Sequence, residues 1–151
     1  LKKKNPDLNL GKLHVLGPSN KKQMLKISYY KNEYPKDIKF YGFVNNAKRD
    51  VVLTSVKYGL HFCKEEHFGR AVLEMQKKGI IVFAHNSGGS TEIIFTNYQK
   101  YLNKNELLSK ISKVLPNPIL QKYILNKTRK NIKNIFTSKI FDKNLLNKLN
   151  A

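Results

Sequence analysis

The stretch KYGLHFCKEEHFGRAVLEMQKKGIIVFAH, residues 57–85, decides the fold because it passes from one kind of secondary structure to another and back. Residues 57–63 are rich in β-formers and predict a strand, whereas residues 67–79 predict a helix that ends at Gly79. We expect one face of this helix to be buried: Phe68, Ala71, Val72 and Met75. The apolar run IIVFAH, residues 80–85, predicts a strand covered on both faces. A strand, a helix and a strand in this order are typical of a parallel sheet.

The same alternation extends toward the amino terminus. Residues 12–20 and 37–44 predict strands, whereas residues 21–34 and 46–56 predict helices, the second with Asn46 as its N-cap. The complete order is therefore β-α-β-α-β-α-β. We expect an α/β fold, a parallel sheet with helices on both faces, in which ligands bind beyond the carboxyl ends of the strands.

Past residue 100 the sequence becomes helical and basic. Residues 104–115, 117–136 and 143–149 predict helices. The breaks between them fall at Pro116, Pro118 and Ser138. No internal repeat and no Gly/Ser-rich linker is present, so we expect one domain over residues 1–151, whose basic helical segment covers about residues 104–151.

Lysine dominates the charge of the chain, which carries 29 Lys and Arg against 10 Asp and Glu, a formal net charge of +19. Such an excess is typical of nucleic-acid-binding proteins. Only Arg49, Arg70 and Arg129 are arginines, although the planar arginine fork favours base and phosphate recognition. The lysines also accompany abundant Asn and Ile, as an AT-rich coding sequence produces on solvated faces. We therefore favour a solvated surface, and keep attraction to an anionic membrane face as a further interpretation.

The chain has one cysteine, Cys63, so the sequence predicts neither an intrachain disulfide nor a cysteine-based metal site. Its place at a strand end favours packing over catalysis, and a reducing environment fits. No apolar run approaches the roughly 20 residues that cross a bilayer. The charged opening LKKKNPDLNL differs from a signal peptide. Because the sequence opens on Leu1 rather than Met, we expect a piece of a longer protein.

The scarce carboxylates Glu66 and Glu74 flank the predicted start of a helix. The first turn of a helix has unpaired N–H groups and a partial positive charge, so it attracts anions such as phosphates. Gly69 permits a ligand to approach the backbone closely. Glu74 lies roughly 9 Å from the helix start, where a carboxylate can accept hydrogen bonds from ribose hydroxyls. The alternative is that Glu66 only favours the helix dipole and that Glu74 is a solvated surface residue.

A second loop, HNSGGST, follows the next predicted strand. Gly88 and Gly89 precede a short predicted helix at residues 90–94, and amides in such a loop can line a phosphate pocket. A lone Gly-Gly pair is more typical of a turn, but two such loops at one edge of a sheet favour a shared site. They indicate a nucleotide-sugar, with phosphate on the amides, ribose on Glu74 and sugar hydroxyls near Glu66.

These residues carry a resemblance to a known family. The segment GLHFCKEEHFGRAVLEMQKKGIIVFAHNSGGSTEII strongly resembles the carboxyl-terminal half of retaining GT-B glycosyltransferases (glycosyltransferase family 4), whose hallmark is Glu, seven residues, Glu. Glu66 and Glu74 have this spacing. Within the family, GLH, EHFG and AHNSGG resemble the dolichol-pathway α-1,2-mannosyltransferases of N-glycan precursor assembly, which use GDP-mannose. The close match spans about residues 58–94. Ser90 stands where relatives usually have proline, which puts the rigidity of the loop in question.

The resemblance implies roles for individual residues. Glu66, as the catalytic residue, would contact the transferred sugar, and Glu74 would bind the ribose. The other donor-binding residues would be His67, Phe68, Gly69, Asn86, Ser87, Gly88 and Gly89. No metal or other cofactor is implied, because this fold class binds the diphosphate through amides and basic side chains. His67 and His85 flank the two loops, and a structural role remains the alternative for each.

The resemblance also implies partners and a location. These are a nucleotide-sugar donor, a lipid-linked oligosaccharide acceptor and the cytosolic face of the endoplasmic reticulum membrane. The family's first carboxyl-terminal strand with its basic residues, the acceptor-binding half and the membrane anchor would precede Leu1, so this chain alone is expected to lack the acceptor half. The basic carboxyl-terminal helices are a second candidate for membrane contact. Two alternatives stay open: a UDP- or ADP-linked donor and, from another class, a Lys-rich nucleic-acid-binding domain.

Overall fold

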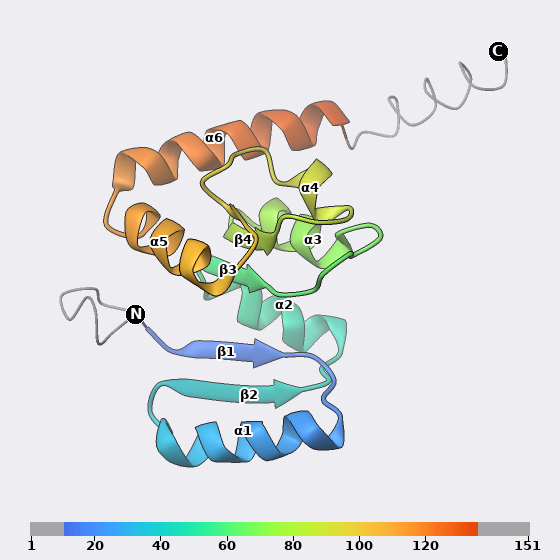
Figure 1. Ribbon diagram of the computed structural model, residues 1–151. Helices are drawn as coiled ribbons and strands as arrows, with labels where there is room; N and C mark the ends of the chain where they lie inside the picture. The colour runs from blue at the N-terminus through green and yellow to red at the C-terminus, as the bar shows by residue number, and fades with distance from the viewer. Residues whose placement is uncertain (1–10, 136–151) are drawn as a thin grey trace, which may run out of the picture. The chain divides into compact units, whose positions relative to one another are not determined.

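The computed structural model describes residues 11–135 (Figure 1). Contacts divide the chain into two compact units, with the division between Val56 and Lys57. Both units are built from helices and parallel strands, which confirms the predicted α/β class. The hydrogen-bonded strands form two sheets, β1–β2 in the amino-terminal unit and β3–β4–β5 in the carboxyl-terminal unit. Among the described residues, no helix is both long enough and apolar enough to cross a membrane.

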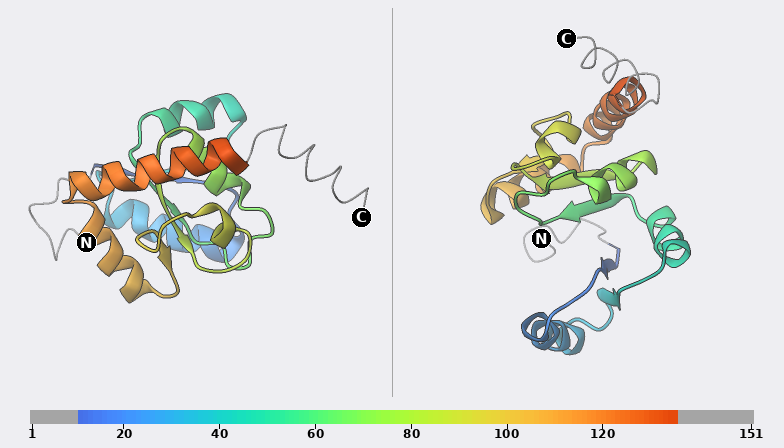
Figure 2. Two further views of the ribbon diagram at one scale, coloured as in Figure 1. Left: turned by 90° about the horizontal axis from the view of Figure 1, so that it is seen from above. Right: turned by 90° about the vertical axis from the view of Figure 1, so that its right-hand side faces the viewer.

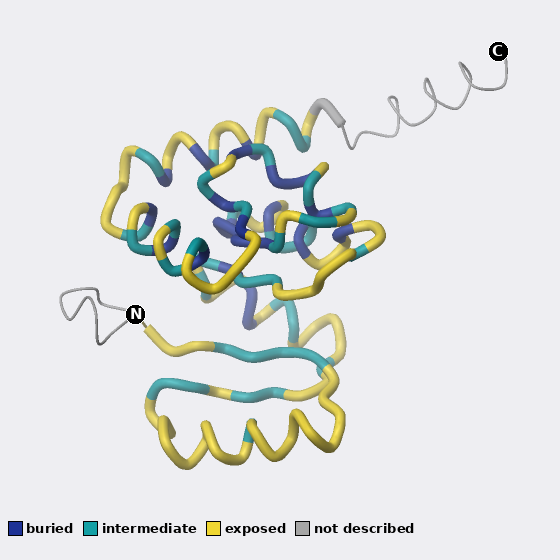
Figure 3. The backbone as a smooth tube through the Cα atoms, in the orientation of Figure 1, coloured by how far each residue is buried: buried dark blue, intermediate teal, exposed yellow. Residues whose placement is uncertain are grey.

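The amino-terminal unit has the predicted order of elements. They are β1 (Leu13–Leu16), α1 (Lys21–Glu33), β2 (Ile38–Gly42) and α2 (Asn46–Thr54). No residue of α1 is buried (Figure 3). The predicted N-cap of α2 is wrong by one position, because Asn45 rather than Asn46 accepts the N–H of Lys48, at 2.9 Å. The extended backbone of Asn45 is what directs its side chain to that donor.

The carboxyl-terminal unit continues the alternation and ends in two long helices. Its elements are β3 (Tyr58–His61), α3 (Arg70–Lys77), β4 (Ile81–His85), α4 (Ser90–Ile93), β5 (Lys100–Tyr101), α5 (Lys104–Val114) and α6 (Pro118–Ile135). α6 packs against α3, α5 and β4 (Figure 2). The predicted helices at residues 104–115 and 117–136 are thereby confirmed over the described residues. The predicted Ser138 break and the helix at residues 143–149 lie outside them.

β4 is the centre of the carboxyl-terminal unit. It lies between β3 and β5, and its residues from Ile81 to Ala84 are at most 1% exposed. This burial confirms the prediction of a strand covered on both faces. Phe83 and Ile81 join a core with side chains from three other elements: Tyr101, Leu107, Ile111, Val114 and Ile124. The dark residues of this unit in Figure 3 mark that core. Because β4 is tightly packed, the point at which the chain leaves this strand is fixed in position.

α3 begins later than the sequence indicates. Gly69 has a φ of 61°, in the left-handed region, and the helix starts at Arg70. Phe68 therefore lies outside the helix and is 77% exposed, and Ala71 is also exposed, so the predicted buried face is wrong at both positions. The buried residues of α3 are Val72 and Gln76. The predicted glycine at the other end is confirmed, because Gly79 follows the last turn with a φ of 78°.

The short strand β5 is not predicted by the sequence. Only its two residues pair with β4, Lys100 opposite Ala84 and Tyr101 opposite His85. A pair of residues has no periodicity, so its strand geometry comes from the neighbouring strand. β5 nevertheless brings a third loop to the edge of the sheet where β3 and β4 end.

Candidate functional site

Two loops lie side by side at the carboxyl edge of the β3–β4–β5 sheet. Loop A (residues 62–69) follows β3, and loop B (residues 86–89) follows β4. Because β3 and β4 are neighbouring parallel strands, the chain leaves the sheet at the same edge after each of them. The expected adjacency of these two segments is confirmed.

The backbones of loops A and B are in direct contact. The N–H of Gly89 donates to the carbonyl of Glu66, with 2.5 Å between nitrogen and oxygen. A Cβ on Gly88 would lie 2.5 Å from the same carbonyl oxygen, and a Cβ on Gly89 would lie 2.5 Å from the carbonyl oxygen of His67. No side chain fits at such separations. The two glycines are therefore required for loop contact, and the Gly89 amide, expected from the sequence to face a ligand, has a partner within the protein.

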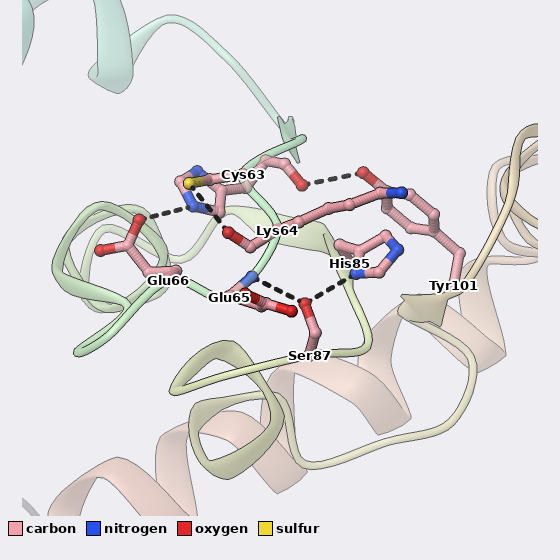
Figure 4. A network of polar contacts seen from close by, with 8 residues as sticks. Cys63, Lys64, Glu65, Glu66, His85, Ser87 and Tyr101 are labelled. Carbon is pink, nitrogen blue, oxygen red and sulfur yellow. Dashed lines mark hydrogen bonds and ion pairs between the residues drawn. The ribbon is translucent and has the colours of Figure 1, made fainter.

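A series of hydrogen bonds holds the strained residue of loop A (Figure 4). Glu65 has a φ of 54°, a conformation that residues other than glycine rarely adopt. Its N–H donates to Ser87 Oγ at 2.9 Å, and Ser87 Oγ lies 2.8 Å from His85 Nδ1. His85 Nε2 lies 3.2 Å from the carbonyl of Leu102, which can only accept. In the neutral ring the proton is therefore on Nε2, and the hydroxyl of Ser87 donates to Nδ1.

The carboxylate of Glu66 is oriented by His61, the last residue of β3. Glu66 Oε2 lies 3.2 Å from His61 Nε2, and the two side chains are 26% and 16% exposed. The hydroxyl of Tyr101 donates to the carbonyl of His61 at 2.8 Å, and burial raises the pKa of Tyr101, so this donor stays protonated. No local pattern in the sequence marks His61 as a site residue, because its contact with Glu66 depends on how loop A turns back toward β3.

The start of α3 has backbone amides without a partner among the described residues, at the exposed residues His67 and Phe68 and at the buried Gly69. Its N-cap, Gly69, has no side chain to accept a bond, and the N–H of Leu73 is the one that reaches the Gly69 carbonyl, at 2.9 Å. Within residues 11–135 no hydrogen bond uses the amides of His67, Phe68 or Gly69. These amides and the positive end of the helix can receive an anion, as the sequence predicts. That they bind one stays a prediction.

Glu74 lies nearer to the start of its helix than expected. Because α3 begins at Arg70, Glu74 is about one turn in, roughly 6 Å along the axis rather than 9 Å. The side chain is partly buried. The position of Glu74 along the helix is therefore closer to the start of α3 than the sequence indicates.

The remaining expected residues differ in their surroundings. His67 and Asn86 are exposed, and the phenyl ring of Phe68 is too exposed to be part of the core. The N–H of Asn86 donates to the carbonyl of Tyr101 at 2.8 Å, so the first residue of loop B is attached to the end of β5. The Asn86 side chain and the His67 ring remain accessible to a ligand.

The loop after β5 is held by a charged pair on α5. The carboxylate of Glu106 lies 2.6 Å from Lys110 Nζ and accepts the N–H of Leu102 at 2.8 Å. The hydrogen bond from Lys110, followed by the one from Leu102, holds the pKa of Glu106 below its ordinary value. The pair fixes the residue whose carbonyl receives the proton of His85.

The end of β3 and loop A together bring three residues of the kinds that bind metals close to one another. Donor atoms of His61, Cys63 and Glu66 all lie within 4.8 Å of one another. The expectation of no cysteine-based metal site considered cysteines alone, whereas one thiolate with an imidazole and a carboxylate is also a metal-ligating set. The spacing His-x-Cys-x-x-Glu is the signal in the sequence that points to it.

Comparison with known proteins gives two matches. Residues 1–131 match the family model described as "Glycosyl transferases group 1". Over 105 residues the chain is 31% identical to the "GDP-Man:Man(3)GlcNAc(2)-PP-Dol alpha-1,2-mannosyltransferase" of Xenopus tropicalis. The alignment covers 67% of this chain and 22% of the relative, so the chain spans about a fifth of the length of that protein.

Proposed function

The chain belongs to the glycosyl transferases group 1 family, and on this premise we propose that loops A and B and the start of α3 bind the nucleotide-sugar donor of a glycosyl transfer. The observation that carries the proposal is the uncapped start of α3 beside Glu66, with Glu74 about one turn along the helix. Along the chain, the carboxylate of Glu66 comes first, the open amides come next and the carboxylate of Glu74 comes last. This order matches the order of sugar, diphosphate and ribose in such a donor.

The chemistry follows from where charge develops. When the bond from the sugar to the phosphate breaks, the diphosphate gains negative charge, and the amides of His67, Phe68 and Gly69 stabilise it at the positive end of α3. Glu66, oriented by His61, accepts hydrogen bonds from the sugar hydroxyls. Glu74 accepts them from the ribose. No protein carboxylate acts as a covalent nucleophile in this scheme.

The finer proposal is that the donor is GDP-mannose and that the protein extends a lipid-linked oligosaccharide in an α-1,2 linkage, at the cytosolic face of the endoplasmic reticulum membrane. The activity named for the Xenopus tropicalis relative supports it, together with the GLH, EHFG and AHNSGG segments. Donor recognition falls to the residues described above.

Thermal unfolding with added nucleotides tests donor binding. We expect GDP and GDP-mannose to raise the melting temperature, since a ligand at 100 times its Kd stabilises the bound state by about 2.7 kcal/mol. UDP and ADP are the comparison ligands. Glu74→Ala should abolish the shift, whereas Glu33→Ala, which removes an exposed carboxylate of α1, should keep it. If none of GDP, UDP and ADP raises the melting temperature, the proposal fails. A larger shift with UDP or ADP than with GDP would mean that the donor carries that nucleotide instead of GDP.

Transfer of radiolabelled mannose from GDP-mannose to a lipid-linked trimannosyl acceptor tests the finer proposal. Glu66→Gln should lower the rate more than 100-fold, because the carboxylate meets the reacting sugar. A titration with single-stranded RNA at several salt concentrations tests the other class. Micromolar binding with a steep salt dependence, unchanged by Glu66→Gln, would favour nucleic-acid recognition through the lysines.

A further inference from the structure

The side chains of His61, at the end of β3, and of Cys63 and Glu66, in loop A, form a compact group that the donor-binding scheme does not fully use. Their donor atoms lie within 4.8 Å of one another, and His61 Nε2 and Glu66 Oε2 are 3.2 Å apart (Figure 4). The thiol of Cys63 is exposed and makes a weak hydrogen bond to the carbonyl of Lys64 at 3.5 Å. The three donor atoms therefore form a triangle whose sides are at most 4.8 Å long.

The backbone already holds this group in place. The carbonyl of His61 accepts the hydroxyl of Tyr101 at 2.8 Å, and the carbonyl of Glu66 accepts the N–H of Gly89 at 2.5 Å. Between these two fixed residues, the N–H of Glu65 is bound by Ser87. The loop that carries the three donors is thus attached at three points, so little order has to be created when a cation binds.

The kinds and spacing of the donors select the cation. Tetrahedral Zn²⁺, with bonds of about 2.0–2.3 Å, separates neighbouring ligand atoms by roughly 3.3–3.7 Å. The His61–Glu66 separation already meets this requirement, and the thiol has to close by about 1 Å. Thiolate and imidazole suit Zn²⁺, whereas Mg²⁺ and Ca²⁺ prefer sets made of oxygen alone. Three protein donors with an exposed side leave the fourth position to water.

We propose that His61, Cys63 and Glu66 bind a Zn²⁺ ion, and that this ion excludes the sugar donor from the site. Binding forms one Zn–S, one Zn–N and one Zn–O bond and releases the thiol proton of Cys63 to solvent. The carboxylate of Glu66, once on the metal, no longer accepts the sugar hydroxyls. The second half of the proposal rests on the proposed function, whereas the first half does not.

Titration of the metal-free 151-residue chain with Co²⁺ alone tests the site directly. A cobalt–thiolate bond gives a charge-transfer absorption in the near ultraviolet, and we expect it to saturate at one ion per chain. Zn²⁺ should then displace Co²⁺ and remove the absorption. A non-chelating phosphine keeps the thiol reduced. Absence of the charge-transfer band at saturating Co²⁺ overturns the proposal.

Matched variants separate a built site from loose surface binding. Cys63→Ser should remove the band, and both Cys63→Ser and His61→Asn should weaken Zn²⁺ binding at least tenfold. Glu65→Gln removes a carboxylate from the same loop without removing a ligand, so it should leave the Zn²⁺ affinity within about twofold of the parent. Equal weakening by Glu65→Gln and Cys63→Ser would mean that only the charge of the loop attracts the ion, and the proposal fails.

Competition is measured as GDP-mannose affinity with and without Zn²⁺. We expect saturating Zn²⁺ to weaken the affinity at least tenfold in the parent and to leave it unchanged in Cys63→Ser. The same variant at the same Zn²⁺ concentration corrects for zinc held by the nucleotide itself. If GDP-mannose binds and Zn²⁺ does not weaken it, the competition is wrong. If GDP-mannose does not bind but the cobalt band forms, the donor proposal fails and the metal site stands.

Discussion

The helices of this chain begin in two different ways. Four of the described helices, α1, α2, α5 and α6, follow an asparagine whose side chain accepts a backbone N–H, and these residues are Asn20, Asn45, Asn103 and Asn117. α3 and α4 follow Gly69 and Gly89, which make no such bond. Asparagine caps are worth about 1 kcal/mol each. At the start of α3 glycine replaces such a cap, which costs only a few tenths of a kcal/mol, and the backbone N–H groups there have no side-chain acceptor among the described residues.

The largest expected effect is at the contact between loops A and B, next to the uncapped helices α3 and α4. Gly88→Ala places a Cβ 2.5 Å from the carbonyl oxygen of Glu66 at a φ of 56°, so loops A and B must separate. We expect a loss of about 3 kcal/mol in the free energy of unfolding, measured with urea. Gly42→Ala is the control, because its φ of 65° is similar but nothing lies within 4 Å. It should cost about 1 kcal/mol. Equal losses would mean that backbone strain, not loop contact, explains the glycine.

The next effect loosens the same loops without a steric clash. Ser87→Ala removes the acceptor of the Glu65 N–H and the donor to His85 Nδ1. We expect a loss of about 2 kcal/mol and faster amide exchange at Glu65. Ser109→Ala, on the exposed face of α5, is the control and should change the free energy of unfolding by less than about 0.5 kcal/mol. Unchanged exchange at Glu65 would contradict a holding role for Ser87.

A smaller effect is expected from removal of an asparagine cap. Asn103→Ala removes the acceptor of the Glu106 N–H, 3.0 Å away, and should cost about 1 kcal/mol. Asn105→Ala lies two residues further on, at an exposed position in the first turn of the same helix, and it should be neutral or slightly stabilising, because alanine favours helix. Nucleotide binding should be the same in both variants. A change in binding that is specific to Asn103→Ala would mean that the capped helices also shape the site.

The smallest effect is a pH dependence at the same helix start. Lys110, and then Leu102, hold the pKa of Glu106 below its ordinary value in the folded chain. A lowered pKa contributes stability above the pKa of the unfolded chain, and this contribution is lost as the pH falls through the folded value. The difference in unfolding free energy between the parent and Glu106→Gln should therefore shrink on acidification. Because both side chains meet solvent, the difference should also shrink with added salt. A difference that is constant with pH would exclude this contribution.

Much of the fold follows from patterns that are local in the sequence. The apolar run of β4 and the glycine after α3 predict a buried strand and a helix end, and both are confirmed. The start of α3 is less predictable, because Phe68 and Ala71 have helical spacing with Val72 while Gly69 interrupts the helix in between. β5 depends wholly on pairing with β4, so no local pattern marks it.

The candidate site, like the fold, can be predicted only in part from local patterns in the sequence. The positions of Glu66, Glu74 and the Gly-Gly pair follow from spacing and from the edge of a parallel sheet. The contacts between loops cannot be predicted from spacing, because each contact depends on a residue distant in the sequence. The bonds of Ser87 to Glu65 and of Tyr101 to His61 are examples. Asn45 and Asn46 have identical side chains, so the sequence does not indicate which of them has the extended backbone of the N-cap.

The contact between loops A and B also has a consequence for timing. With the Glu66 carbonyl held by Gly89 and the Glu65 amide held by Ser87, the site is assembled before a ligand arrives. For the nucleotide binding proposed above, loops A and B therefore need no further closure toward each other. In stopped-flow mixing we therefore expect one exponential phase whose rate rises linearly with GDP concentration, as in a simple encounter. A rate that levels off at high concentration would reveal a closing step after all.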